Sequence, residues 1–435
     1  MSEQKDIQHS RPRWHYSPRS TWMNDPNGLI HYAGTWHLFY QSNPSGSTWG
    51  NMSWGHATST DLLHWTEHPV ALWHTDTEQI FSGSCVFDAT NSSDLGTADW
   101  PPLVALYTAH YLPGSERLGT QAQCLAYSLD GGSHWTTYPG NPVLDRGSAN
   151  FRDPKVFRHG DQWVMVAVEA EHQHVLIHTS TNLIDWTYRS TFGPAHAAGG
   201  AWECPDLFEL AVAGSDETRW VLLVNLNPGG VAGGSGCQYF VGDFDGTTFT
   251  PDRVVGTSLD RRPGPDDPTL RSYDWLDFGR DCYAVVSFAD APDGRRIVLG
   301  WMNNWDYAYD VPLTGGRSIM TIPRELELVP LKGGYRLRQR PIRELPGDAL
   351  AHYELRAGDR VSIGGVALEY RNGVLSLDRR GAGVEDFHEA FGSRQWAEIP
   401  GNPDTVQVDV LVDTCSIEVF AAEGMVTISD LVFFR

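Results

Sequence analysis

The sequence predicts an all-β protein in which a five-bladed β-propeller, residues 1–340, precedes a small β-sandwich, residues 341–435. Three observations support this. The 435 residues include 44 Gly and 26 Pro, so turns are frequent, and the apolar runs between them are short and rich in aromatics. Two motif series recur through the first part of the chain. The second part loses both series and changes to short alternating strands.

The first series marks the outer edge of each predicted blade. A strand is followed by an Asp or Asn turn and then by an aromatic residue that opens the next strand. This pattern occurs at residues 59–65, 128–135, 180–186 and, more loosely, 241–249. Turns rich in Asp, Asn and Gly between such strands indicate repeated hairpins.

The second series marks the inner strand of each blade. Its key positions are 56, 72, 50 and 71 residues apart, and they are Asp25, Phe81, Asp153, Glu203 and Asp274. In a propeller the first strand of every blade faces the central channel. We therefore expect these five side chains to converge at one mouth of that channel.

The alternating segments after residue 345 predict the strands of the sandwich. We expect strands at residues 360–368, 374–377, 406–412, 416–420 and 426–432. Few side chains of this region are chemically reactive, so it is interpreted as a domain that packs on the propeller.

The charge balance limits the partners. Against 32 Lys and Arg stand 54 Asp and Glu, a net charge of −22, which repels phosphate backbones and anionic lipids. We expect no nucleic acid and no membrane as partner, whereas a neutral substrate is compatible. The sequence does not predict the oligomeric state.

The compartment is predicted from two features. The first thirty residues lack the apolar run of a signal peptide, and the six cysteines are scattered singly. These features predict a cytoplasmic protein, or a secreted one if the chain is a trimmed mature form.

Three acidic residues of the inner series suggest glycoside hydrolysis. Asp25, Asp153 and Glu203 lie in turn-like contexts, Asn-Asp-Pro, Arg-Asp-Pro and Glu-Cys-Pro, and a single such context would be only a turn signal. Three of them in phase with a repeat indicate carboxylates gathered in one site. Retaining hydrolysis of a sugar needs one carboxylate as nucleophile and one carboxylic acid as acid/base. The 17 Trp residues provide flat faces for stacking on sugar rings.

Six motifs together resemble glycoside hydrolase family 32, which contains invertases, levanases, inulinases and related fructosyltransferases. They occur in order along nearly the whole chain and read WMNDPNG, FSGS, FRDP, WECPD, GWMNNW and TIPREL. The resemblance implies a five-bladed propeller with a β-sandwich. It also implies Asp25 as nucleophile, Glu203 as general acid/base and Asp153 as stabiliser of the transition state.

The resemblance extends to the pocket that would hold the fructosyl unit. Positions that match pocket residues of similar proteins are Asn24, Gln41, Trp49, Asn51, Phe81 and Ser84. Arg152 could bind a site carboxylate or a sugar oxygen, and Cys204 is interpreted as a packing or tuning residue. Trp301 and Trp305 are candidates for the pocket rim or for the core. Asp274 is a candidate for the leaving-group subsite or for a turn cap.

The implied activity is a retaining β-fructofuranosidase acting on levan or inulin, with sucrose as a further candidate substrate. This chemistry needs no cofactor or metal, although His172, His174 and His178 would share one face of a strand. Two alternatives remain. A fructosyltransferase would use the same site with a sugar acceptor, for example to form a difructose anhydride. A non-catalytic glycan-binding propeller would require the loss of a carboxylate.

Overall fold

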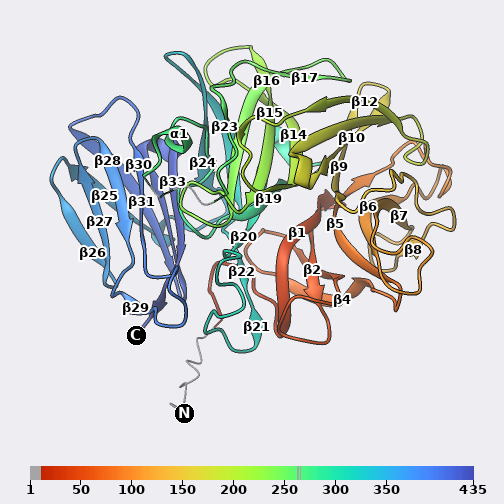
Figure 1. Cartoon of the computed structure of the whole chain (residues 1–435), viewed down its shortest axis with the longest axis horizontal. Helices are drawn as coiled ribbons and strands as arrows, with labels where there is room; N and C mark the ends of the chain where they lie inside the picture. The colour runs from red at the N-terminus through yellow and green to blue at the C-terminus, as the bar shows by residue number, and fades with distance from the viewer. Residues whose placement is uncertain (1–10, 262–263, 265) are drawn as a thin grey trace.

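The computed structural model describes residues 11–261, 264 and 266–435, and the regular structure of these residues is almost entirely β. Figure 1 shows a sandwich of strands at one side of a larger ring of sheets. The described residues contain one short α-helix, α1 (Pro268–Arg271), and no helix among them has the length and apolarity to cross a membrane. The predicted all-β class, with a propeller followed by a C-terminal sandwich, is confirmed.

Five strands form the inner ring of the propeller. They are β1 (Thr21–Tyr32), β5 (Glu78–Phe87), β9 (Phe151–His159), β14 (Ala201–Ala211) and β19 (Tyr283–Ser287). Each contacts the next and β19 contacts β1, which closes the ring. Each inner strand also belongs to its own largely antiparallel sheet. We interpret each sheet as one blade.

The outer strands complete these sheets in chain order. The first sheet adds β2 (Thr35–Asn43), β3 (Ser53–Ser59), β4 (Thr66–Leu72) and β21 (Gly316–Arg317), and the second adds β6 (Leu103–Tyr111), β7 (Gln121–Ser128) and β8 (Thr136–Thr137). The third sheet adds β10 (Gln162–Glu169), β11 (His174–Ser180) and β12 (Thr187–Phe192), and the fourth adds β15 (Thr218–Asn227), β16 (Gly236–Phe244) and β17 (Phe249–Pro251). The fifth sheet adds β20 (Ile297–Met302), β22 (Ile319–Met320), β23 (Arg324–Leu331) and β24 (Gly334–Pro341). Outside them, β13 (His196–Ala197) pairs with β18 (Thr257–Ser258), and two 3-10 turns, η1 (Ala170–His172) and η2 (Pro292–Gly294), join strands.

The repeated outer motif is a structural turn between the third and fourth strands of a blade. In three blades the indole N–H of the motif tryptophan donates to the carbonyl three residues earlier, at 3.0 Å for Trp65, 3.1 Å for Trp135 and 2.9 Å for Trp186. The Asp or Asn side chain of each turn accepts backbone N–H bonds. This repeat therefore determines the shape of the blades and does not contribute to the channel.

The sandwich consists of two four-stranded sheets. One holds β25 (Leu350–Arg356), β31 (Thr405–Asp413), β32 (Ser416–Ala421) and β33 (Val426–Leu431), and the other holds β26 (Arg360–Ile363), β27 (Val366–Arg371), β28 (Val374–Asp378) and β30 (Arg394–Glu398). The short pair β29 (Gly383–Val384) and β34 (Phe433–Phe434) and the turns η3 (Gly347–Ala349) and η4 (Ala422–Gly424) complete it.

One sandwich prediction is wrong. The expected single strand at residues 360–368 is the hairpin β26–β27. Gly364 and Gly365 interrupt it with φ of 58° and 95°, left-handed values that glycine adopts without strain and that a two-residue hairpin turn requires. The proposed domain boundary at residues 340/341 falls at the end of β24 and stays a prediction.

A buried ionic cluster joins the sandwich to the propeller. Arg324, at the start of β23, donates to Glu418 of β32 and to Asp277. His15 binds Glu418 with Nε2 at 2.7 Å and Asp413 with Nδ1 at 2.8 Å. We call these five residues the interdomain cluster. It connects the N-terminal segment, the fifth blade and the sandwich.

Candidate active site

Every inner strand departs from regular pairing near its beginning. Register shifts occur around Asp25, Ser82, Asp153, Cys204 and Ala284. Three of these residues have left-handed backbones, with φ of 62° at Asp153, 43° at Cys204 and 52° at Ala284. A bulge redirects the side chains beside it, and such bulges are typical of strands next to active sites.

The redirected side chains line one pocket of about 420 Å³. It is formed by Asn24, Asp25, Gln41, Trp49, Phe81, Ser82, His110, Gln121, Arg152, Asp153, Glu203, Asn227, Trp305 and Tyr309. The three predicted carboxylates therefore lie together, although 178 positions separate Asp25 from Glu203 in the sequence. We call this the carboxylate pocket.

Asp25 is held by donors on both of its oxygens. The Asn24 amide donates to Oδ1 at 3.0 Å, and the Ser82 hydroxyl donates to Oδ2 at 2.7 Å. The Trp22 indole donates to the Asn24 side-chain oxygen at 2.8 Å and so orients that amide. Burial, and next the negative charge of Glu203, raise the pKa of Asp25. These donors fix the orientation of the Asp25 carboxylate, but they carry no positive charge that would neutralise it.

Among the described residues, Arg152 is the one cationic side chain that lines the pocket, and it binds Glu203. Arg152 donates to its Oε1 from Nε at 3.2 Å and from Nη2 at 3.0 Å, and the Tyr283 hydroxyl donates to its Oε2. Of the two alternatives for Arg152, the structure shows a bond to a site carboxylate. Burial, followed by the charge of Glu203, raises the pKa of Tyr283 well above its usual value, so this phenol remains a donor.

Asp153 is buried beside both other acids. Its Oδ2 accepts the backbone N–H of Cys204 at 2.9 Å, and Arg152 lies 4.0 Å from the same oxygen. Burial and the charges of Glu203 and Asp25 raise the pKa of Asp153 to about 7, although Arg152 opposes them. The Cys204 thiol faces Asp25 and Asp153, and burial raises its pKa well above the usual value, so it is a neutral thiol.

Aromatic side chains form the wall of the pocket. Trp305 stacks on Trp22 with ring centroids 5.9 Å apart, and Tyr309 stacks on the same indole at 5.3 Å. On another side Trp49 meets Phe81 edge-on at 5.8 Å, and His110 stacks on Phe81 at 4.9 Å. Trp49 is 38% exposed, so its ring is available to a ligand. Such flat faces suit the C–H faces of a sugar ring.

The prediction for Ser84 is wrong. The bulge between Phe81 and Gly83 makes Ser82 the serine that enters the pocket. Ser84 is buried and joins two blades, because its hydroxyl donates to the Pro154 carbonyl at 2.8 Å and accepts the Val156 N–H at 3.0 Å.

Asn51 and Trp301 also lie outside the pocket lining. Asn51 is exposed in a turn with a left-handed φ of 49°, and its carbonyl accepts the Ser53 hydroxyl. Trp301 is fully buried and packs behind Trp305 at 4.8 Å, so of its two predicted places it takes the core. Trp305 takes the pocket.

The fifth inner position was assigned to the wrong residue. Asp274 precedes β19 and lies in a different groove, where it pairs with Arg253 at 3.6 Å. Tyr283 begins the inner strand and reaches Glu203. The fifth blade therefore contributes a phenol to the site and not a carboxylate.

The sequence reasoning missed several lining residues. Ser82 lies inside the FSGS motif, and the Gly after it is a bulge signal that could have identified it, whereas Tyr309 lies four residues beyond GWMNNW. His110, Gln121 and Asn227 come from second and third strands and belong to no motif. Only the blade geometry places them at the pocket.

The histidine group does not share a strand face. His172 lies in η1, whereas His174 begins β11 and His178 is buried within it. Among the residues the structure describes, no group of three or more His, Cys, Asp and Glu is placed to hold a metal ion.

A pair of acids in a channel mouth, with a third beside them and aromatic walls, is typical of the class of glycoside hydrolases. The model of the glycosyl hydrolases family 32 N-terminal domain matches residues 15–341, and that of the family 32 C-terminal domain matches residues 366–434. The chain belongs to glycoside hydrolase family 32.

Individual relatives agree with this assignment. The levanase of Bacillus subtilis is 41% identical over 97% of this chain, which spans 66% of that protein, slightly less than two thirds. The extracellular exo-inulinase of Aspergillus ficuum is 38% identical over 97% of this chain and 89% of its own length. The crystal structure of the exo-inulinase from Aspergillus awamori has a TM-score of 0.88 at 36% identity and covers 99% of this chain and 94% of its own.

Proposed function

We propose that the chain is a retaining β-fructofuranosidase that releases terminal fructosyl units from fructans, levan or inulin, and from sucrose. The observation that carries the proposal is the carboxylate pocket itself. Acids from three inner strands meet there, and each is oriented by its own donors. The relatives named levanase and exo-inulinase support the fructan as substrate class.

In the first step Asp25 is the nucleophile. Its Oδ forms a bond to C2 of the fructosyl unit while the bond from C2 to the leaving oxygen breaks, and the leaving oxygen takes a proton from Glu203. Ser82 and Asn24 aim the carboxylate before the substrate arrives. The product of this step is a fructosyl-enzyme with an ionised Glu203.

In the second step Glu203 acts as base. It removes a proton from water, the oxygen of that water attacks C2, and the bond to Asp25 breaks. Arg152 and Tyr283 stabilise the ionised form of Glu203 between the two steps. Two displacements at C2 return the original β configuration.

Asp153 binds the hydroxyls of the fructosyl unit and stabilises the transition state. With three carboxylates and one guanidinium, the pocket retains a proton near neutral pH, as the raised pKa of Asp153 indicates.

The two alternatives are less well supported. A fructosyltransferase would use the same acids, but the relatives cited above are named as hydrolases. A glycan-binding module would not need three oriented carboxylates. The compartment, cytoplasmic or secreted after trimming, stays a prediction; the relative from Aspergillus ficuum is named extracellular. The exclusion of nucleic acid and membrane as partners stays a prediction from charge.

One product analysis tests the proposal. The full chain is incubated in parallel with levan, inulin and sucrose, the products are separated by chromatography, and proton NMR follows the first anomer formed. We expect free fructose from the start, as β-fructofuranose. An α anomer would contradict the double displacement, and a cyclic disaccharide would identify a transferase. Binding without release of any sugar would identify a binding module. Asp25→Asn is the control.

A further inference from the structure

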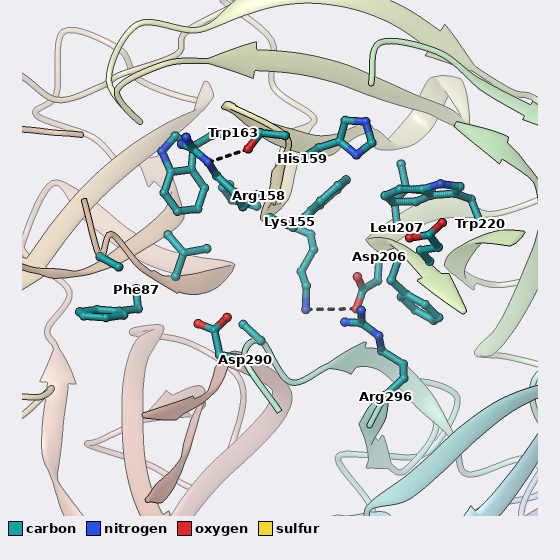
Figure 2. Close-up of a pocket in the computed structure, with 18 of the residues that line it drawn as sticks. Phe87, Lys155, Arg158, His159, Trp163, Asp206, Leu207, Trp220, Asp290 and Arg296 are labelled. Carbon is teal, nitrogen blue, oxygen red and sulfur yellow. Dashed lines mark hydrogen bonds and ion pairs between the residues drawn. The ribbon is translucent and has the colours of Figure 1, made fainter. Parts of the chain in front are cut away.

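A buried ion pair crosses the channel a few residues past the carboxylates along the inner strands (Figure 2). The Lys155 ammonium lies 3.1 Å from Oδ2 of Asp206 and donates to the Ser287 carbonyl, so that β9, β14 and β19 are linked. None of these three residues lines the carboxylate pocket. Lys155 and Asp206 line a separate cavity of about 500 Å³. A substrate therefore reaches the carboxylates from the channel mouth on their own side.

One wall of that mouth is a loop of turns, residues 303–311, which we call the aromatic loop. It follows β20, precedes β21 and contributes Trp305 and Tyr309 to the lining of the carboxylate pocket. The two rings stack on Trp22 and lie 6.1 Å from each other. Tyr309 is 46% exposed, and the loop has no strand pairing of its own. Side chains outside the pocket therefore have to hold this wall in place.

The sandwich holds the aromatic loop at Tyr307, midway between the two pocket aromatics. Tyr307 does not line the pocket; it is buried, and its hydroxyl donates to Oδ1 of Asp281 at 2.6 Å. Arg379, the sandwich residue directly after β28, donates to the same hydroxyl at 2.9 Å and to Oδ2 of Asp281 at 2.6 Å. Phe391 of the sandwich meets the Tyr307 ring edge-on at 5.3 Å. We call Tyr307, Asp281 and Arg379 the loop anchor.

The sandwich side of the loop anchor is itself firmly held. Arg379 also donates to the Phe391 carbonyl at 2.7 Å and to the Leu431 carbonyl at 2.9 Å. The side chains of Arg379 and Asp281 have no exposed surface. Val311, at the end of the aromatic loop, packs in one buried cluster with Phe391 and Leu431. A buried polar network with its bonds made is rigid, so the sandwich determines where this side of the loop lies.

The propeller attaches the aromatic loop at a second place. The Asn304 amide donates to the Arg280 carbonyl at 2.8 Å, and the backbone N–H of Trp305 donates to the Ser235 hydroxyl at 3.1 Å. Removing the Tyr307 hydroxyl leaves these bonds in place, together with the ion pair of the loop anchor. Such a change should therefore alter the orientation of the loop without unfolding it.

We propose that Tyr307 is a positioning residue for substrate binding, through which the sandwich holds Trp305 and Tyr309 against the sugar. The inference rests on the proposed function, in which a sugar fills the carboxylate pocket. An aromatic wall that contacts the sugar equally in the ground state and in the transition state contributes to binding and not to the chemical step. The donors that orient Asp25 and Glu203 lie outside the aromatic loop. The loop anchor therefore acts on KM and leaves kcat unchanged.

The first test separates KM from kcat in Tyr307→Phe, which removes only the hydroxyl. Steady-state kinetics use whichever of levan, inulin and sucrose the wild type hydrolyses. We expect KM to rise roughly 10-fold, as one displaced aromatic contact would cause, with kcat within about 2-fold. Tyr370→Phe is the matched control, since Tyr370 is a fully buried phenol whose hydroxyl donates to the Pro403 carbonyl within the sandwich. Its KM should equal that of the wild type. An unchanged KM in Tyr307→Phe, or an equal rise in both variants, would overturn the inference.

A double-mutant cycle tests whether the sandwich acts through this hydroxyl. Arg379→Lys keeps a cation beside Asp281 and removes the Nη2 donor to Tyr307. It should raise KM as well, and the double variant should raise KM by less than the product of the two single effects. Effects that multiply would show two separate routes and would overturn the inference.

A spectroscopic measurement decides the question without turnover. The chain is labelled with 5-fluorotryptophan, ¹⁹F NMR is recorded without substrate, and Trp305→Phe and Trp49→Phe assign one resonance on each side of the pocket. Tyr307→Phe should shift the Trp305 resonance and leave that of Trp49 unchanged. A Trp305 resonance that stays still would overturn the inference even where Arg379→Lys does not fold. A wild type that hydrolyses none of the three sugars, with the Trp305 shift present, would count against the proposed function alone.

Discussion

The carboxylate pocket and the interdomain cluster both bury carboxylates next to arginine, and they place those charges in opposite situations. In the pocket, Arg152 binds Glu203 and lies near Asp153, and burial and mutual repulsion raise the pKa values of Asp25 and Asp153. In the cluster, hydrogen bonds and the charges of Arg324 and His15 outweigh burial and lower the pKa values of Asp413 and Glu418.

This difference separates groups arranged for reaction from groups arranged for stability. Every carboxylate oxygen of Glu418 and Asp413 accepts at least one hydrogen bond from a protein donor. In the pocket, by contrast, negative charges exceed positive ones, and the excess can stabilise the oxocarbenium ion that develops on the substrate. Changes in the pocket should therefore alter rate more than stability, and changes in the cluster should do the reverse.

The largest effect is expected at the two reacting carboxylates. Asp25→Asn and Glu203→Gln should each lower kcat by at least ~10²–10⁴-fold. In Asp25→Asn the free energy of unfolding should stay equal or rise, because a buried charge is removed. Glu203→Gln should recover on substrates with good leaving groups, which need little protonation, and Asp25→Asn should not. Steady-state kinetics on two leaving groups, with urea unfolding of each variant, checks both. Equal sensitivity to the leaving group would refute the assigned roles.

The cluster should show the opposite pattern. Arg324→Met removes the cation that binds Asp277 and one of the two cations that bind Glu418, the other being His15, and the free energy of unfolding should fall by about 3–5 kcal/mol. The kcat of the folded enzyme should not change. Arg343→Met is the matched control, since Arg343 and its partner Asp293 are 60% and 63% exposed and such pairs contribute less than about 1 kcal/mol. A loss of kcat in folded Arg324→Met would show that the two regions are not independent.

His15 gives the cluster a dependence on pH at the alkaline side. Hydrogen bonds and the charges of Asp413 and Glu418 outweigh burial and raise the pKa of His15 to about 9, against 6.5 when unfolded. The stabilisation is complete below pH 6.5 and is lost as the pH rises through 9, with an amplitude on the order of 3 kcal/mol. Urea unfolding between pH 6 and 10 should show this slope in the wild type and not in His15→Gln.

Asp153 should give the pocket a slope at lower pH. Its folded pKa is about 7 and its unfolded value 3.8, so between these values the folded chain holds a proton that the unfolded chain has released. Raising the pH through this window therefore lowers the free energy of unfolding, on the order of 4 kcal/mol. Asp153→Asn should remove the slope between pH 4 and 7 and be more stable than the wild type at pH 7.5. The same slope in both proteins would show that Asp153 is ionised throughout.

The difference between local and long-range interactions explains which parts of the structure the sequence could predict. The blade turns, the three acids and the sandwich follow from local patterns, because turn residues and alternation act within a few positions. Ser84, Asn51 and Asp274 were assigned to the pocket from motif position, but a bulge, a left-handed turn and a strand that begins nine residues later decide where the side chains lie. The interdomain cluster joins residues about 400 positions apart and has no local signal at all.

The smallest expected effect gives the sharpest comparison, since it involves two serines of one strand. Ser82 donates to the carboxylate of Asp25, whereas Ser84 joins β5 to the backbone of β9. Ser82→Ala should lower kcat about 10-fold, because one hydrogen bond to a charged group contributes about 1.5–3 kcal/mol, and should leave stability nearly unchanged. Ser84→Ala should leave kcat within about 2-fold and lower the free energy of unfolding by about 1–3 kcal/mol, since a buried N–H and a buried carbonyl lose their partner. Kinetics and urea unfolding of both variants show whether kcat falls more in Ser82→Ala and the free energy of unfolding falls more in Ser84→Ala. If Ser84→Ala slowed the reaction as much as Ser82→Ala, the bulge in β5 would not separate the reacting side of the strand from its supporting side.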